Sequence, residues 1–220
     1  YQQPQQLSVN DLIRIREKQV RSAYLLKYGN IVDGAGWDDS IKSVAVSTLK
    51  LQIMAASQNS QVKIDVSDKS QDFRQATFIM YNCARLAKLF HHYEESVQQG
   101  HYPPLPQIDE VDFSLLREKD EWKLLVCYVM QYPAVVRDAL NDLLSPTHDS
   151  IVTVNINKMC CFLLDLCKDF SSYYGRTHVL GEPRPHLFPS MFARLYLLKA
   201  IQQVFHNCLA LMDIQPLTQM

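Results

Sequence analysis

The sequence lacks any long hydrophobic run and any excess of charge of one sign. No stretch of about 18 apolar residues occurs, so we expect no membrane-spanning helix. The chain carries 22 Lys and Arg against 23 Asp and Glu. This balance argues against a protein that coats nucleic acid without specificity, although it leaves room for one basic face. Because the sequence shows no signal peptide and begins at Tyr1, we expect a piece of a longer protein.

Cysteine pairs at metal-ligand or redox spacing are also missing. The six cysteines stand at positions 83, 127, 160, 161, 167 and 208, and none of them forms a C-x-x-C motif. Most of them lie in apolar helical stretches, which is typical of free buried thiols in a reducing compartment. Free thiols predict a cytoplasmic protein. The alternative interpretation of the six cysteines is a disulfide framework.

The motifs of the common catalytic sites are absent. The chain has no P-loop, no G-x-G-x-x-G and no G-x-S-x-G. Residues 91–95 (HHYEE) are rich in metal-ligand side chains, but a further partner at ligand spacing is lacking, so we interpret them as exposed helix residues. We therefore predict a non-enzymatic protein with no catalytic residue, no metal and no cofactor.

Helical periodicity, by contrast, extends over most of the chain. Apolar residues recur every three or four positions, and short alternating segments at 62–66 and 151–154 do not amount to a sheet. This predicts an all-α helical bundle. Residues 1–7 are interpreted as a linker and 8–220 as one domain, with a candidate internal boundary at the proline-rich segment 100–112. The expected helices span about 9–28, 37–57, 71–98, 113–130, 132–144, 156–174 and 190–213.

The last of these helices is predicted to organise the core, because its apolar residues form a broad face that must be buried. Ser190 is a candidate N-cap for it. Arg194 falls within the apolar face, where a charge needs a partner or a route to water. We expect a packed arginine stem with a paired or solvent-reaching head.

One face of the helix 71–98 combines cationic and aromatic residues. On a helical wheel Arg74, Tyr81, Arg85, Lys88 and His92 fall within about 60° of one another. RNA offers regularly spaced phosphates and unstacked bases, which stack on aromatic rings and guanidinium planes. The stripe therefore suits RNA binding; the alternative is a solvated face bordered by a half-buried tyrosine.

Five stretches resemble, in combination and in this order, the DALR anticodon-binding domain of class I arginyl-tRNA synthetases. They are LSVNDLIRIREKQVRSA (7–23), FIMYNCARLAKLF (78–90), YPAVV (132–136), SSYYGRTHVL (171–180) and the terminus ARLYLLKAIQQVFHNCLALMDIQPLTQM (193–220). The second is similar to the Y-A-H-A/S-R helix of the family, the third to its F-P-x-V-V segment and the last to its A-R-L-L-L…L-x-L-L-G-I…M end.

The resemblance implies a role in RNA binding for particular residues. Tyr81 and Arg85 match the tyrosine and the arginine of the Y-A-H-A/S-R helix, and Tyr174 matches an aromatic residue at the end of the penultimate long helix. His178 stands where some relatives carry tryptophan, and Met220 matches a terminal methionine beside the anticodon. Together with the stripe, the predicted RNA-binding set is Tyr81, Arg85, Tyr174, His178, Met220, Arg74 and Lys88.

The sequence departs from this pattern at two places. Asn82-Cys83 replaces the Ala-His of the family, and Asp213 replaces a glycine near its end. The signatures of a synthetase catalytic domain are absent, so the chain most resembles the stand-alone DALR anticodon-binding-domain proteins of animals. That implies an adaptor that binds arginine tRNAs, not DNA, and presents them to a tRNA 3-methylcytidine methyltransferase. Alternatives are a protein-interaction scaffold without RNA binding and the C-terminal part of an active synthetase.

Overall fold

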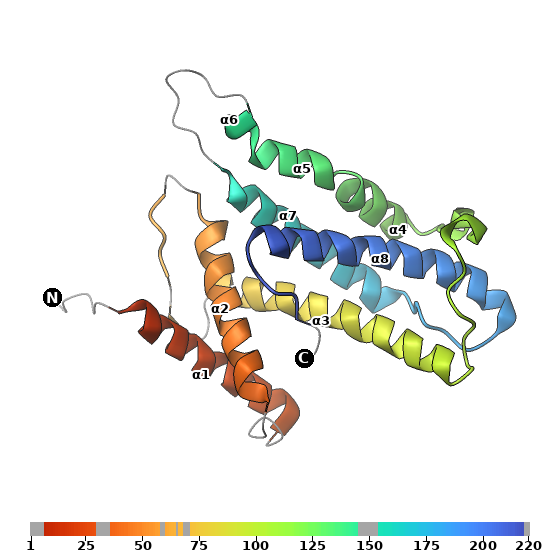
Figure 1. The fold of residues 1–220 in the computed structure, drawn as a ribbon, viewed down its shortest axis with the longest axis horizontal. Coiled ribbons are helices and arrows are strands. Elements are labelled where there is room, and N and C mark those ends of the chain that lie inside the picture. The colour runs from red at the N-terminus through yellow and green to blue at the C-terminus, as the bar shows by residue number, and fades with distance from the viewer. Residues whose placement is uncertain are drawn as a thin grey trace.

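The computed structural model describes residues 7–29, 36–57, 60–64, 66–67, 71–144 and 154–217. All regular elements in these residues are helical (Figure 1), which confirms the all-α class. In the same residues, no helix is both long and apolar enough to cross a membrane. The elements are α1 (Val9–Tyr28), α2 (Trp37–Ala55), α3 (Gln71–Gln98), η2 (Ile108–Glu110), η3 (Phe113–Leu115), α4 (Lys119–Leu124), η4 (Leu125–Val129), α5 (Tyr132–Ala139), α6 (Asn141–Leu144), α7 (Ile156–Arg176), η5 (Pro185–Leu187) and α8 (Phe188–Leu211).

Local sequence accounts for several helix starts. Ser8 caps α1, because its hydroxyl accepts the Asp11 amide at 3.2 Å while the Asp11 carboxylate accepts the Ser8 amide at 3.1 Å. The prediction that Ser190 caps α8 is wrong. Pro189 lacks an N–H and fits a first turn, so α8 begins at Phe188. The Ser190 hydroxyl instead donates to the Leu187 carbonyl at 3.0 Å.

The segment 113–144 is more broken than predicted. Two long helices were expected there, but the chain forms the 3-10 turn η3, the short helix α4, the π-helix η4 and then α5 and α6. A capping box restarts the helix at Glu118, whose amide donates to the Glu121 carboxylate at 3.0 Å. Pro133 lies in the first turn of α5, where its missing N–H costs no hydrogen bond.

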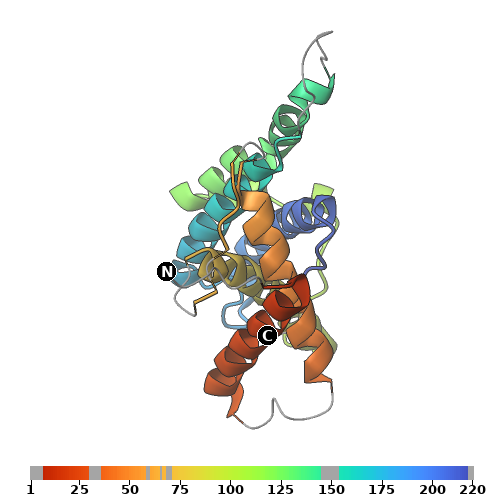
Figure 2. The ribbon, with the colours of Figure 1, turned by 90° about the vertical axis from the view of Figure 1, so that its left-hand side faces the viewer.

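The buried side chains form two clusters. The larger lies among α3, α7, α8 and the α4–α5 segment, and the smaller joins α1 and α2 to Phe73 of α3. α2 contributes to both, with Leu51 in the larger cluster and Val44 in the smaller. Figure 2 shows the α1–α2 pair extending from one side of the molecule and α5 and α6 from the other. α8 is a core element, as predicted, and ten of its residues are buried.

A buried ion pair joins α4 to α8. Glu121 is fully buried, and its Oε1 accepts from Arg194 Nε at 2.7 Å and from the Tyr173 hydroxyl of α7 at 3.3 Å. The Arg194 side chain keeps 23% of its surface exposed. The prediction of a packed arginine with a paired head is therefore confirmed, and its partner lies 73 residues away in the sequence.

Candidate nucleic-acid interface

Two of the predicted RNA-binding residues are brought together by one turn of α3. Tyr81 and Arg85 are four residues apart, so their side chains lie on the same face. The guanidinium carbon of Arg85 lies 4.5 Å from the centre of the Tyr81 ring, and Nη2 donates to the Tyr81 hydroxyl at 2.8 Å. The cation thus lies over the ring within the range of a cation–π interaction.

α7 supplies a second ring to the same guanidinium. The Arg85 guanidinium carbon lies 5.0 Å from the centre of the Tyr174 ring, and Nη1 donates to the Ser171 hydroxyl at 3.1 Å. Ser171 and Tyr174 are three residues apart and share a face of α7. All four side chains are partly buried. We call Tyr81, Arg85, Ser171 and Tyr174 the tyrosine–arginine cluster.

The Tyr174 hydroxyl is protonated at neutral pH, as in an ordinary tyrosine. Burial raises the pKa of this phenol above its usual value; the Arg85 guanidinium lowers the pKa by less than burial raises it, and Tyr81 adds a smaller increase. The ring also packs against Phe170, with ring centres 5.7 Å apart. At neutral pH the cluster therefore offers aromatic rings, a fixed cation and hydroxyl groups, the groups that single-stranded RNA recognition uses.

Sequence reasoning missed two residues here. Ser171 lies in the SSYY stretch but was not among the predicted contacts, although its spacing of three from Tyr174 places it on the same face. The second missed residue is Tyr173, whose ring is fully buried at this end of α7. The next residue, Tyr174, is only partly buried. No periodicity argument distinguishes these neighbours, because both lie within one broad helical face.

The other predicted residues lie outside the cluster. Arg74 and Lys88 are exposed on α3, before and after it. His178 is exposed and lines a separate polar pocket with Arg176 and Arg194, in which Asp120 pairs with the Arg176 guanidinium at 2.5 Å. Met220 lies outside the described residues.

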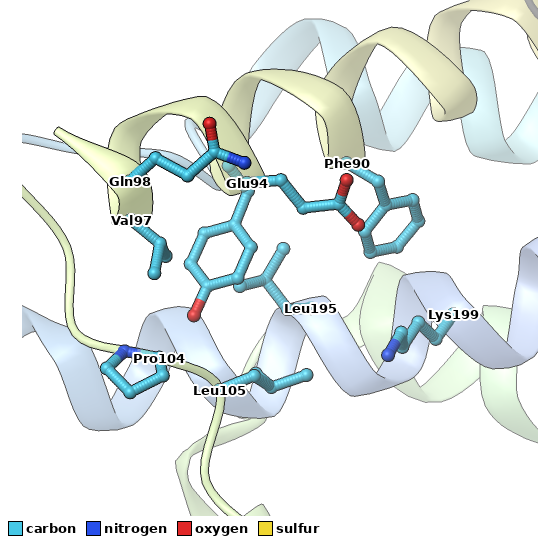
Figure 3. Close-up of a pocket in the computed structure, with 9 residues that line it drawn as sticks. Phe90, Glu94, Val97, Gln98, Pro104, Leu105, Leu195 and Lys199 are labelled. Carbon is cyan, nitrogen blue, oxygen red and sulfur yellow. The ribbon is translucent and has the colours of Figure 1, made fainter.

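An apolar pocket lies between the end of α3, the segment 104–105 and α8 (Figure 3). Phe90, Tyr93 and Leu195 line it, and Glu94 and Lys199 bring a charge of each sign to it. Elsewhere, over the ranges that the structure covers, no group of three or more His, Cys, Asp or Glu side chains could hold a metal ion. In the stretch 91–95, His91 contacts Glu95 at 3.3 Å on the surface of α3.

The sequence departure within α3 does not alter the helix face that carries Tyr81 and Arg85. Asn82 and Cys83, which replace the Ala-His of the resembled family, are both buried. The Asn82 Nδ2 donates to the Phe78 carbonyl at 2.8 Å within the helix. The two substitutions therefore change the core side of α3 and leave Tyr81 and Arg85 in place.

Comparison with known proteins places this geometry in a family. Residues 79–220, which include all of the cluster, match the DALR anticodon binding domain. The chain belongs to the DALR anticodon-binding domain family. The match begins within α3, so the α1–α2 pair precedes it.

Relatives of this DALR chain include animal proteins and bacterial ligases. It is 40% identical over 215 residues to the mouse DALR anticodon-binding domain-containing protein 3 and 38% identical over 219 residues to that of Danio rerio. These alignments cover 97% and 98% of this chain but only 40% and 39% of the relatives, so the chain spans about two-fifths of their length. Identity to the arginine–tRNA ligase of Syntrophotalea carbinolica is 28% over 152 residues, 69% of this chain and 24% of the ligase.

Solved structures show the same fold. The arginyl-tRNA synthetase of Thermus thermophilus superimposes with a TM-score of 0.70 at 15% identity, over 100% of this chain and 33% of that enzyme. At this identity the likeness concerns the fold alone. The predicted bundle type, that of the anticodon-binding domain of class I synthetases, is thereby confirmed.

Proposed function

We propose that this DALR domain binds the anticodon loop of arginine tRNAs in the cytoplasm and acts as a non-catalytic adaptor. In this proposal it presents the tRNA to a methyltransferase that makes 3-methylcytidine. The observation that carries RNA binding is the guanidinium of Arg85 held against the rings of Tyr81 and Tyr174 in a domain of the anticodon-binding family. The adaptor role and its arginine tRNAs follow from the resemblance.

Contacts within the cluster hold the Arg85 guanidinium in one place, which favours binding. Two hydroxyls, those of Tyr81 and Ser171, fix the orientation of the guanidinium plane. When an unstacked base binds to such a surface, the base loses conformational entropy, but the protein side chains lose little because they are already held in place. Lys88, exposed on the same helix three residues after Arg85, can contact a phosphate of the same RNA.

Variants of Arg85 and Tyr174 test this proposal in titrations with an arginine tRNA. Loss of a stacked base costs about 1–3 kcal/mol, so Tyr174→Ala should weaken binding about 5- to 150-fold. Arg85→Lys keeps the charge but removes the planar guanidinium, and should weaken binding nearly as much as Arg85→Ala. Lys168→Ala, on an exposed part of α7, is the matched control. Unchanged affinity in a folded Tyr174→Ala variant, verified by circular dichroism, would contradict the proposal.

A protein-binding scaffold is the second candidate, because α4 and η4 expose an apolar line. Trp122, Val126 and Met130 recur every four residues and are 49%, 43% and 65% exposed. Val126 and Met130 carry no ring on which a base could stack, so this surface suits a protein partner better than RNA. Association with the methyltransferase that survives nuclease, together with no tRNA binding by the purified chain, would favour the scaffold.

A further inference from the structure

A polar pocket lies beside the C-terminal end of α7, where this end meets the start of α4 and the N-terminal part of α8. Its volume of about 430 Å³ lies within the range of small-ligand sites. All of its lining side chains are polar: Glu118, Asp120, Arg176, Thr177, His178 and Arg194. None of them belongs to the tyrosine–arginine cluster. We call this site the α7-end pocket.

Contacts around the pocket fix its two guanidinium groups and leave N–H groups unused. Arg176 Nη2 donates to Asp120 Oδ2 at 2.5 Å and to the Ser172 hydroxyl at 3.0 Å. Arg194 Nε donates to the fully buried Glu121 carboxylate at 2.7 Å. A guanidinium also carries N–H donors on both Nη atoms, and within the described residues those of Arg194 have no acceptor. The pocket therefore presents free donors whose position is set by the protein.

Carboxylates balance the positive charge of the pocket. Glu118 and Asp120 line it, and Glu121 contacts Arg194 from the buried side. These three carboxylates oppose the two arginines and any charge on His178, so the pocket does not favour a phosphate. In the part of the chain that the structure describes, Asp120 Oδ1 accepts no hydrogen bond. A ligand that both donates and accepts hydrogen bonds therefore fits this arrangement better than an anion does.

The edge of a nucleobase is such a ligand. Arginine side chains typically donate to the carbonyl of guanine, and carboxylates accept from the amino group of cytosine. Cytosine and guanine each carry an amino group and a carbonyl group on the Watson–Crick edge, whereas uracil lacks the amino group and adenine lacks the carbonyl. Unpaired bases of RNA expose this edge to protein side chains. The free oxygen of Asp120 and the free N–H groups of Arg194 therefore suit cytosine or guanine.

The α7-end pocket is a neighbour of the tyrosine–arginine cluster. Ser171 accepts from Arg85 of the cluster, and the next residue, Ser172, accepts from Arg176 of the pocket. The Cα atoms of consecutive residues are only about 3.8 Å apart. A nucleotide next to a base that stacks on Tyr174 can therefore reach the pocket.

We propose that the α7-end pocket binds the edge of a cytosine or guanine in the RNA segment whose neighbouring base stacks on the tyrosine–arginine cluster. Asp120 accepts from the amino group of this base, and Arg194 donates to its carbonyl. The inference rests on the proposed function, because the cluster holds the RNA beside the pocket. It adds a preference for particular bases, which stacking on aromatic rings does not provide.

Binding of oligocytidylate and oligouridylate of equal length measures this preference. The chain should bind oligocytidylate at least about five-fold more tightly, which is the lower end of the discrimination that a good pair of hydrogen bonds to a base provides. In Asp120→Asn the remaining oxygen faces Arg176, so an amide N–H replaces the free acceptor and the preference should fall below about two-fold. Asp165→Asn removes the same charge from an exposed site on α7; it is the matched control and should keep the preference.

Several results would overturn the inference. They are equal binding of the two oligonucleotides by the unsubstituted chain, no binding of either, or a preference that survives in an Asp120→Asn variant whose circular dichroism shows that it is folded. Equally tighter binding of both oligonucleotides by Asp120→Asn would indicate a phosphate contact and would overturn it as well. The proposed function fails separately, if the unsubstituted chain does not bind an arginine tRNA more tightly than an unrelated tRNA at about 0.15 M salt.

Discussion

Removal of the buried Glu121 carboxylate should destabilise the fold strongly. Its two oxygens accept from three groups, namely Arg194 Nε, the Tyr173 hydroxyl and the Glu118 amide, and the side chain is fully buried. In Glu121→Ala these donors lose their acceptor inside the protein. Breaking a buried ion pair by removing one partner typically costs about 3–5 kcal/mol.

The lower end of that range applies here. The Arg194 side chain retains 23% exposure, so its head can recover part of its hydration. We expect Glu121→Ala to lower the free energy of unfolding by about 3 kcal/mol, which for a chain of this size lowers the thermal midpoint by about 6–12 °C. Urea denaturation followed by far-ultraviolet circular dichroism measures the first quantity, and a thermal scan measures the second.

Two further variants locate the cause. Glu121→Gln keeps the shape and one acceptor oxygen, so it should cost less than Glu121→Ala. The double variant Glu121→Leu/Arg194→Met removes both charges, and it should recover much of the loss because no uncompensated buried charge remains. A loss below about 1 kcal/mol in Glu121→Ala, a value typical of exposed ion pairs, would refute this reasoning.

Two other predictions concern titratable side chains. In the folded chain a thiol reagent should label Cys127 and Cys161, which are exposed, and it should reach all six thiols only in denaturant. Burial raises the pKa of the other four, Cys83, Cys160, Cys167 and Cys208, so rapid labelling of more than two would contradict the core. Burial also raises the pKa of Tyr93 to about 12 and raises those of Tyr128 and Tyr173. The folded state therefore favours the neutral phenols, and their contribution to stability is present below about pH 10 and is lost as the pH rises through the folded values. A free energy of unfolding that stays constant between pH 9 and pH 12, followed in urea, would contradict this assignment.

Helix-level features of the fold could be predicted from the sequence, because they depend on local periodicity and capping. α1 and α3 have the expected bounds, and the Ser8 capping box forms. The helix breaks within segment 113–144 could not be predicted from periodicity. The capping box at Glu118 restarts the helix, and the π-helix η4 (Leu125–Val129) packs against α8. Periodicity also indicated that Arg194 needs a partner, but it could not identify Glu121.

The candidate site was predictable in part. The spacing of Tyr81 and Arg85 within one helix placed them together, and the resemblance added Tyr174 from another helix. Ser171 was missed, because its contact depends on how α3 packs against α7. The Asp120–Arg176 contact was also missed, since it joins residues that are 56 positions apart, and no local pattern links them.

The most direct test of the account is a titration of the purified chain, and of its Tyr174→Ala variant, with an arginine tRNA and an unrelated tRNA at about 0.15 M salt. The arginine tRNA should bind more tightly than the unrelated tRNA, and its affinity should fall about 5- to 150-fold in the variant. Equal binding of the two tRNAs, or no loss in a folded variant, would contradict it.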